Sequence, residues 1–416
     1  MSTGLLDGSL EKRFHVFMPK KSLSDGLTVD PFRGVRFRYG RGSLTTAMCP
    51  PYDVIGPDLA RTLRSNKSSA VHLELPPGGP STKYSNARKT LVRWRKNGTL
   101  MQDGSPCFYL VEQHFKFGGK SYRRTGLLTA LGLDGATAKR VLKHEKTLPK
   151  HKVDRTRLLR KVKANTSPIF GIYSDAGRRV RTVLDKVKRR AVEATGKDSA
   201  GVAYRVWRIE DPKETQAISR AMQSRKLLIA DGHHRYEVAR EYWAKTREKG
   251  ADRILAYIVA EEDSGLVVHP THRVLEDAAF VRKTAERLCR FKEQRSLGAL
   301  EKALARTKSP YAFGLIDGNL RLAEPTSKAS AVPTGFGTDW LARRLFGRVD
   351  VHDIVYCHGS DEAVREAKRR RGVAVLVKPF SVSEIRKAVE RGGLLPQKST
   401  YFYPKIATGI AFRVFR

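Results

Sequence analysis

The segment KLLIADGHHRYEVAREYWA, residues 226–244, shows most directly how this chain folds. An apolar run, residues 227–230, is followed at once by Asp231 and Gly232. In residues 233–244 the apolar positions then recur at the spacing of one helix face. The segment therefore predicts a buried strand, a tight turn at the glycine and a helix.

The predicted turn has the features of an anion-binding site. Gly232 would let the backbone pass close to a ligand, and the first N-H groups of the following helix have no partner within the helix. Such a helix start suits a phosphate, and His233, His234 and Arg235 add further donors. In the alternative interpretation, Asp231 only caps the helix and the histidines are ordinary surface residues.

Composition bounds the class of protein. The chain has 416 residues, 40% hydrophobic and 29% charged, which is enough for two or three compact units. No stretch approaches the roughly 18 apolar residues of a membrane span. Charges interrupt the first twenty residues, where a secretory signal would need an apolar run, so we expect a cytoplasmic protein without a membrane partner. The 4 cysteines are widely spaced and predict buried thiols, not a disulfide framework or a zinc site.

The net charge is the strongest feature of the composition. A formal charge of +38, from 80 Lys and Arg against 42 Asp and Glu, would attract any polyanion, so nucleic acid is a candidate partner. The basic residues nevertheless occur along the whole chain, often at helical surface spacing, as in residues 178–190. No zinc-finger, leucine-zipper or RNP-type pattern accompanies them. A generally solvated basic surface is the alternative explanation.

The chain divides into sections of different pattern. Residues 1–29 predict an irregular leader, and residues 30–85 and 223–280 predict a core that contains the strand, turn and helix. Residues 86–222 have their own alternations and turns and predict an inserted mixed section. In residues 281–416 helices alternate with short apolar runs, which is typical of an α/β arrangement.

Motifs in these sections resemble known families. DGHHR between a strand and a helix resembles the phosphate-handling motif of the ParB/sulfiredoxin superfamily, especially of its free L-serine kinases. The whole chain also resembles the large family called domain of unknown function 1015, which contains serine kinase-like members. The segments that carry this resemblance are, in order, PFRGVRFRYG (31–40), PPYDVI (50–55), HEKTLPKHKVDRTRLL (144–159), SPIFGIY (167–173), IADGHHRYE (229–237), HPTHRV (269–274) and QKSTYFYPK (397–405).

The resemblance implies an α/β (α+β) fold with a cleft. Residues 30–85 and 223–280 would form a ParB/sulfiredoxin-like core, interrupted by the inserted section. Residues 281–416 would form a C-terminal α/β domain that closes the cleft. The DGHHR turn would hold the nucleotide phosphates through Gly232, His233, His234 and Arg235, and nucleotide and acceptor would meet between the two domains.

One residue fits the role of general base. In the serine kinases a turn made of proline, an aromatic residue and an acid carries the carboxylate that takes the proton from the serine hydroxyl, and Pro51-Tyr52-Asp53 fits that position. Asp53 is one methylene shorter than the glutamate usual there, which leaves its reach open. Alternatively, Asp53 stabilises an Asx-type turn after two prolines.

Residues later in the chain would bind the acceptor. Lys398, Ser399 and Thr400 resemble a Lys-Thr-Thr element that holds the phosphate or carboxylate of phosphoserine, with an ordinary surface turn as the alternative. Arg273 would be the clamp for a carboxylate or phosphate. The neighbouring His272 is a second candidate for substrate binding, with a position in the core as its alternative.

The resemblance also implies a metal-assisted reaction. Asp231 and His233 would be catalytic, and Asp231 with Glu237 or Glu145 would hold Mg²⁺ against the phosphates of ADP or ATP. The sequence has no GxxxxGKS loop and no protein-kinase motif set, so a nucleotide would bind through this superfamily's own cradle. HEKT (144–147) lacks the second histidine of a zinc hydrolase motif and receives no role.

Three functions follow from these observations. The first is a phosphotransferase that moves a phosphoryl group from ADP or ATP to a small hydroxyl acceptor, with free L-serine as the acceptor. The second is a nucleic-acid or nucleotide-binding protein without kinase activity, but the residues after 245 return to a strand where a ParB partition protein needs a helix-turn-helix. The third changes the acceptor, or replaces the donor with pyrophosphate. The sequence gives no indication of oligomeric state.

Overall fold

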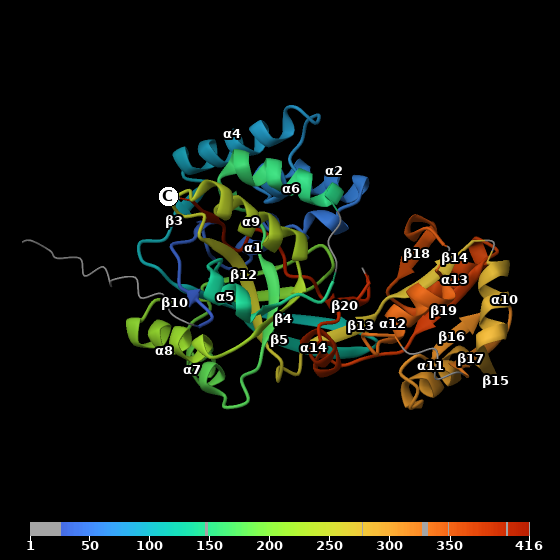
Figure 1. The fold of residues 1–416 in the computed structure, drawn as a ribbon. Helices are drawn as coiled ribbons and strands as arrows, with labels where there is room; N and C mark the ends of the chain where they lie inside the picture. Colours follow the sequence, from blue (N-terminus) through green and yellow to red (C-terminus); the bar gives the residue numbers. More distant parts are fainter. Residues whose placement is uncertain are drawn as a thin grey trace, which may run out of the picture.

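The computed structural model describes residues 26–145, 149–276, 278–326, 332–347, 349–396 and 398–415. The predicted leader lies almost wholly outside this range, as do Lys146, Thr147 and Gln397. The described chain forms two units, each built on a β-sheet with helices packed on it (Figure 1). The predicted mixed α/β class is thereby confirmed, while the ParB-like arrangement of the core stays a prediction.

The first unit is built on a nine-stranded sheet. Its strand order is β6-β11-β8-β12-β5-β4-β10-β9, with β1 added beside β5. Neighbouring strands are antiparallel except in the pairs β6/β11 and β8/β12. The strands are β1 (Val29–Asp30), β4 (Phe108–Phe117), β5 (Lys120–Gly132), β6 (Val141–Leu142), β8 (Ile169–Tyr173), β9 (Ala194–Lys197), β10 (Ala203–Ile209), β11 (Leu227–Asp231) and β12 (Arg253–Ala260).

Both faces of this sheet are buried. Side chains alternate along each strand, so Leu110 and Ile258 belong to the core on one face, whereas Tyr109 and Tyr257 belong to the core on the other. Fully burying a side chain of this size contributes about 1.5–3 kcal/mol. One face is covered by α7 (Arg179–Val187), α8 (Pro212–Gln223) and α9 (His233–Thr246), the other by α1 (Ser43–Ala47), α14 (Val382–Glu390) and residues 402–411.

A further layer of helices lies beside α9 (Figure 1). Its core combines the β2–β3 pair with apolar residues from the surrounding helices. In this layer α6 packs against both α4 and α9, so it connects the outer helices to the sheet. The elements here are β2 (Val35–Phe37), η1 (Tyr52–Val54), α2 (Pro57–Ser65), α3 (Val71–Glu74), α4 (Lys83–Lys96), β3 (Leu100–Gln102) and α6 (Pro149–Val162); α5 (Gly135–Arg140) lies next to β6.

The second unit is an antiparallel sheet of six strands in the order β15-β17-β16-β19-β14-β18. The strands are β14 (His272–Leu275), β15 (Cys289–Glu293), β16 (Phe313–Ile316), β17 (Leu320–Pro325), β18 (Ile354–Cys357) and β19 (Val373–Val377). One face packs on α10 (Ala279–Leu288), α12 (Gly337–Trp340) and the π-helix η3 (Leu341–Leu345), the other on α11 (Leu297–Arg306) and α13 (Ser360–Arg369). A short 3-10 helix, η4 (Val351–Asp353), precedes β18.

The end of the chain returns to the first unit. The strand β13 (Val267–Pro270) leads out of it and pairs with β20 (Thr400–Tyr403), which leads back. Residues 404–415 then run along the first unit, where Thr408 pairs with Cys49 and Phe412 with Val35. The last strand, β21 (Arg413–Val414), pairs with β7 (Ala164–Asn165), which places the end of the chain beside α9 and α4 (Figure 1).

Two sections therefore differ from their predicted organisation. Residues 86–222 supply β4, β5, β8 and β10 to one continuous sheet, in which β8 pairs with β11 and β12 and β5 pairs with β12, so they form no separate insertion. Residues 398–415 belong mainly to the first unit and not to the C-terminal one. Both differences have one cause: alternation in a strand predicts a half-buried or buried surface but does not identify the strand beside it.

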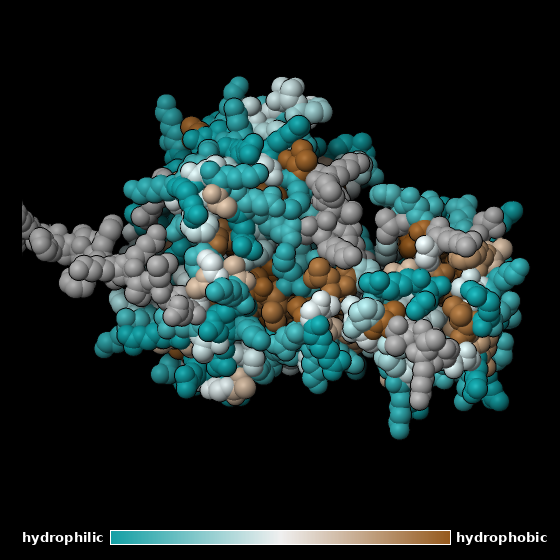
Figure 2. All heavy atoms as spheres, viewed as in Figure 1, coloured by the Kyte–Doolittle hydropathy of each residue, from teal (hydrophilic) through white to brown (hydrophobic). Residues whose placement is uncertain are grey.

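The surface seen in Figure 2 is predominantly hydrophilic, and hydrophobic side chains show mainly where the two units meet. Within the described chain, no helix combines the length and the apolar character needed to cross a membrane. All four cysteines are buried and free, which confirms the prediction made for them.

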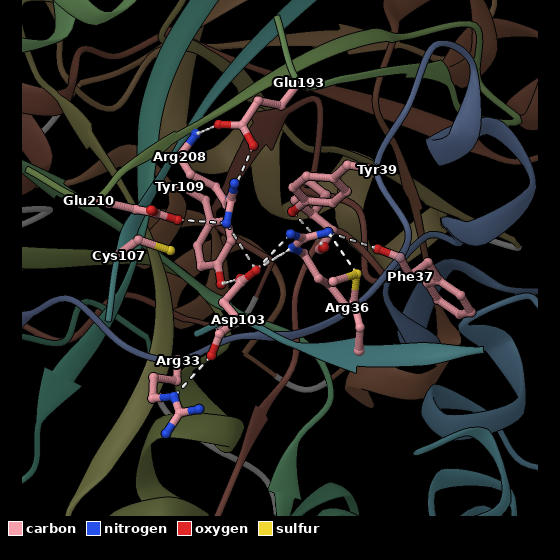
Figure 3. A network of polar contacts seen from close by, with 12 residues as sticks. Arg33, Arg36, Phe37, Tyr39, Asp103, Cys107, Tyr109, Glu193, Arg208 and Glu210 are labelled. Carbon is pink, nitrogen blue, oxygen red and sulfur yellow. Dashed lines mark hydrogen bonds and ion pairs between the residues drawn. The ribbon is translucent and has the colours of Figure 1, made fainter. Parts of the chain in front are cut away.

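A buried ion network holds the edge of the first unit together (Figure 3). Arg36 of β2 donates through Nε to both oxygens of Asp103, at 2.9 Å and 3.1 Å. Arg208 of β10 reaches the same carboxylate at 3.2 Å, and the hydroxyl of Tyr109 in β4 donates to it as well. Arg208 is in turn paired with Glu193 at 2.6 Å. Asp103 therefore connects three strands through one buried charge.

Asp103→Asn keeps the shape of this side chain and removes the charge that balances Arg36 and Arg208. We expect the free energy of unfolding to fall by about 3 kcal/mol, because breaking a buried ion pair leaves an uncompensated charge. Urea unfolding followed by circular dichroism measures the change. Asp58→Asn is the control, since the Asp58–Arg61 pair is exposed and should contribute less than about 1 kcal/mol. Equal losses in the two variants would contradict a structural role for the network.

Candidate functional site

The predicted strand, turn and helix are present at Asp231 and Gly232. The strand β11 ends at Asp231, and its register against β8 shifts between Ile229 and Asp231. Such an irregularity re-aims the side chain at the end of a strand. Gly232 follows with a φ of 88°, and an added Cβ would lie 3.0 Å from Ile169 Cγ2, so both conformation and space favour glycine. The helix α9 begins at the next residue.

Asp231 is an ion-paired carboxylate and not a helix cap. The N-cap of α9 is Gly232, without a side-chain hydrogen bond, which excludes the capping alternative. Arg235 Nη2 lies 2.5 Å from Asp231 Oδ2, and Lys405 Nζ lies 3.1 Å from Oδ1. Burial acts to raise the pKa of Asp231, but Lys405 and Arg235 outweigh it and hold this pKa below its usual range. Asp231 is therefore ionised at neutral pH.

Lys405 brings the two predicted acids together. Its ammonium group bonds both Asp231 and Asp53, so the motifs at residues 50–55 and 229–237 converge on one cation. Burial lowers the pKa of Lys405, yet attraction to Asp231 and Asp53 more than offsets this and raises it. The lysine stays protonated. Lys405 is the last residue of the motif at residues 397–405, but nothing in the sequence pattern identifies its ionic partners.

A buried glutamate positions the turn that carries Asp53. Glu74 is fully buried and accepts hydrogen bonds from the hydroxyls of residues 166–167, at 2.7 Å and 2.9 Å. It also accepts the backbone N-H of Tyr52 at 3.4 Å. The guanidinium of Arg155 lies 3.6 Å from Glu74 and 3.9 Å above the Tyr52 ring. These contacts hold the turn against α3 and α6, and sequence reasoning missed all of them.

Two neutral histidines line the inner side of the site. His144 is fully buried, with Nδ1 2.8 Å from the carbonyl of Ile229 and Nε2 2.8 Å from Thr400 Oγ1. Nδ1 therefore donates to the carbonyl, and Nε2 accepts from the hydroxyl. Burial lowers the pKa of His144 to about 4, and burial together with His144 lowers that of His233. The His233 ring lies edge-on, 4.7 Å from His144, and its buried Nε2 has no partner within the described chain.

The predicted element at residues 398–400 divides between two roles. Thr400 contacts His144 and also lies 3.4 Å from Glu145 Oε1, so its hydroxyl belongs to the site. Burial raises the pKa of Glu145 to about 7, although backbone N-H groups of Thr400 and Ser399 oppose the shift. The Ser399 hydroxyl is fully buried and donates to the Pro396 carbonyl at 2.6 Å. Ser399 is therefore engaged within the protein.

Arg273 and His272 also have distinct surroundings. His272 Nδ1 accepts the backbone N-H of Val377 at 3.1 Å, so His272 is part of the second unit's core, as its alternative interpretation held. Arg273 is buried and donates to the carbonyls of Thr271 and Lys398. Burial lowers the pKa of Arg273 to about 10, which leaves it charged at neutral pH. The Arg273 guanidinium therefore provides a cation on the second unit's side.

The expected magnesium ligands do not form one group. Glu237 is paired with Lys143 and with Lys152, each at 2.9 Å, whereas Asp231 is paired with Arg235 and Lys405. Within the described residues, no cluster of three or more His, Cys, Asp or Glu side chains could hold a metal ion. The residues present do not fit a Mg²⁺ ion held by Asp231 and Glu237, because each carboxylate already faces its own cations.

The remaining candidates lie around the same turn. His234 occupies the first turn of α9 and is partly buried. Lys398 adopts a φ of 60°, with its ammonium 5.7 Å from the centre of the Tyr356 ring. His358 stacks on Tyr401 at 3.7 Å, and neither was predicted from the sequence. Aromatic side chains from β18 and β20 thus lie near the ionic groups.

The sequence matches the family described as "Protein of unknown function (DUF1015)" over residues 29–351. The chain belongs to this family. The matched range includes the motifs up to residue 274 and ends at residue 351. The return segment with Lys398 and Lys405 therefore lies beyond it. No curated protein matches the sequence.

Several solved structures are similar to parts of this chain. A conserved hypothetical protein from Pyrococcus furiosus is 17% identical, with 68% of this chain and 94% of that chain covered and a TM-score of 0.38. A free serine kinase variant in complex with ADP is 15% identical, covering 68% and 92%, with a TM-score of 0.40. The free serine kinase in complex with AMP has the same identity and TM-score, covering 68% and 91%. TM-scores of this size establish no common fold.

Lys405→Met removes the cation shared by Asp53 and Asp231. At pH 7 we expect a loss of about 2 kcal/mol in the free energy of unfolding, because Asp231 then keeps only one of its two cations and a charge-assisted contact contributes about 1.5–3 kcal/mol. The pKa of Asp231 is lower in the folded protein than in the unfolded chain. Asp231 therefore stabilises the fold at pH values above its unfolded pKa, and this stabilisation is lost as the pH falls through its folded pKa. The loss caused by the variant should therefore persist down to about pH 4, the usual range of an unfolded aspartate, and shrink below it.

Urea unfolding of both proteins between pH 7 and about pH 2 measures this dependence. Lys226→Met is the matched control, since the Lys226–Glu390 pair is exposed and should contribute little at any pH. A loss that stays constant over this range would show that Lys405 acts through packing and not through its charge.

Proposed function

We propose that this protein is a phosphotransferase that moves a phosphoryl group from ADP or ATP to a small hydroxyl acceptor, with free L-serine as the acceptor. The observation that carries the proposal is the convergence of Asp53 and Asp231 on Lys405 beside the start of α9. Phosphoryl transfer needs a proton acceptor, cations for the developing charge and a cradle for the phosphates. These three elements occur here within contact of one another.

Asp53 is the proposed general base. Its side chain is about 38% exposed, whereas that of Asp231 is 22% exposed, so an acceptor can approach Asp53 more easily. In the proposed reaction the hydroxyl oxygen of serine attacks the terminal phosphorus of the donor, and its proton passes to a carboxylate oxygen of Asp53. The bond from phosphorus to the bridging oxygen breaks, which releases AMP from ADP or ADP from ATP.

Groups at the start of α9 are proposed to hold the phosphates. The N-H groups of residues 233–235 have no helical partner, and the conformation of Gly232 directs this helix start towards the end of β11. Arg235 and Lys405 supply positive charge, and the unpartnered Nε2 of the neutral His233 can hydrogen-bond a phosphate oxygen. Asp231 keeps Arg235 and Lys405 in place. The assignment of this arrangement to the ParB/sulfiredoxin superfamily is part of the proposal.

Cations from the second unit are proposed to orient the acceptor. Arg273 is buried and charged, and Lys398 lies beside the Tyr356 ring. A guanidinium suits the carboxylate of an amino acid because it can donate two parallel hydrogen bonds. Thr400 adds a hydroxyl between His144 and Glu145. The groups proposed to bind phosphate lie on the first unit, and the cations proposed to bind a carboxylate lie on the second. This separation favours a small acceptor that carries its own negative charge.

Asp53→Asn tests the base. We expect it to lower kcat for phosphoserine formation by a factor of about 100 or more, since general-base catalysis contributes about 10²–10⁴. Affinity for the nucleotide should change by less than about threefold, because the phosphate cradle is intact. The assay supplies L-serine with ADP, ATP or pyrophosphate in turn, and calorimetry measures nucleotide binding. Asp58→Asn, an exposed substitution on α2, is the control.

Product from one donor that is lost in Asp53→Asn would support both the activity and the role of the base. Absence of product from every donor would contradict serine as the acceptor. A nucleotide affinity that falls as far as kcat would contradict the assignment of Asp53 as base.

Arg235→Ala tests the cradle separately. Arg235 bonds Asp231 and the Pro168 carbonyl, so its removal frees Asp231 from one of its two cations. We expect nucleotide affinity to fall by about tenfold or more, because a charge-assisted contact contributes about 1.5–3 kcal/mol. Calorimetry with ADP and ATP measures this. Arg240→Ala, on the same helix but further from the turn, is the matched control, and an equal fall in that variant would exclude a local role for Arg235.

A further inference from the structure

A cavity of about 220 Å³ lies between the second unit's sheet and α14, apart from the residues of the candidate site. It is bounded by residues 334–338 and by Leu341, by residues 377–380 at the end of β19, and by one side of α14. Binding sites for drug-sized ligands usually enclose about 300–1,000 Å³, so this cavity suits a smaller molecule. None of the motifs that predicted the function lies in it.

Apolar side chains form one part of the cavity lining. Phe336 and Phe380 both line it, and their rings contact each other at 5.1 Å with a tilt of 60°. The remaining apolar lining comes from Pro310, Ala312, Leu341, Val377, Pro379 and Ala388. Two aromatic rings at an angle present one edge and one face, which is a favourable surface for another flat ring.

Positive charge surrounds the apolar interior. Lys308, Lys387 and Arg391 line the cavity and are exposed, and their charged groups have no bonding partner within the described chain. The two other charged residues of the lining are already engaged. Lys378 donates to the carbonyls of residues 307 and 309, and Glu384 accepts from the backbone and hydroxyl of residue 381. The three unengaged cations therefore favour an anionic group on the ligand.

We propose that this cavity is a binding site for a small aromatic anion, a flat ring that carries one phosphate or carboxylate group. The ring lies against Phe336 and Phe380, and the anionic group faces Lys387 and Arg391. Because this site shares no residue with the cleft, it does not depend on the phosphotransferase proposal.

The cavity is nevertheless connected to the candidate site through one hydrogen bond. Val377 lines the cavity, and its backbone N-H donates to His272 Nδ1 at 3.1 Å. The next residue along β14 is Arg273, whose guanidinium reaches towards Lys398. A ligand that packs on Val377 thus touches the strand pair that positions Arg273.

Phenyl phosphate is the probe that tests the site, measured by calorimetry and by ligand-observed NMR on the full chain. We expect saturable binding of one molecule per chain. Phenol and inorganic phosphate should each bind at least about tenfold more weakly, because each lacks one of the two recognised parts. Lys387→Ala with Arg391→Ala should weaken phenyl phosphate binding about tenfold or more.

Controls separate this cavity from the cleft. Arg365→Ala with Lys368→Ala removes two exposed charges of α13 that do not line the cavity, and it should leave affinity unchanged. Because both double variants alter exposed residues, thermal unfolding should be unaffected in each. No saturable binding up to about 10 mM phenyl phosphate would overturn the proposal. So would equal binding of inorganic phosphate, or loss of binding in Lys405→Met instead of in the cavity variants.

Discussion

The ammonium of Lys405, held between Asp53 and Asp231, is the interaction on which the assembly of the site depends. Three segments far apart in the sequence meet at this one group. Burying a lysine alone is strongly unfavourable, so the ammonium of Lys405 depends on the two carboxylates beside it. The arrangement therefore couples the return of the chain from the second unit to the geometry of the η1 turn and of the strand β11. A site assembled in this way forms only when the whole chain is folded.

The large sheet makes that coupling possible because both of its faces are buried. Helices α7, α8 and α9 cover one face, while α14 and the return segment cover the other. The end of β11 is thus held from both sides, and the shift in its register leaves Asp231 directed out of the sheet. The second unit is attached through β13, β20 and α14, so its cations are brought to the edge of the same sheet.

The local parts of this arrangement could be predicted from the sequence. The strand, glycine turn and helix at residues 227–246 occur as expected, since the apolar periods and the glycine are properties of adjacent residues. The expectation that Asp53, Thr400 and Arg273 lie near this turn came from motif resemblance. What the sequence did not reveal depends on partners distant along the chain. Nothing in the pattern distinguishes Lys405 from the other basic residues, and the buried position of Glu74 becomes evident only once the helices are packed. The sheet pairing of residues 86–222 was missed for the same reason.

Charge balance at the site bears on the proposed binding of a nucleotide. Asp53 and Asp231 carry two negative charges, and Lys405 with Arg235 carries two positive ones, so the group is close to neutral. Entry of phosphates adds negative charge that the neutral histidines cannot balance, whereas the start of α9 and the buried Arg273 can. Phosphate oxygens would compete with Asp53 for the ammonium of Lys405, because both are anionic oxygen acceptors. In the proposed reaction, donor binding would therefore release a carboxylate oxygen of Asp53 at the moment when the acceptor hydroxyl needs one.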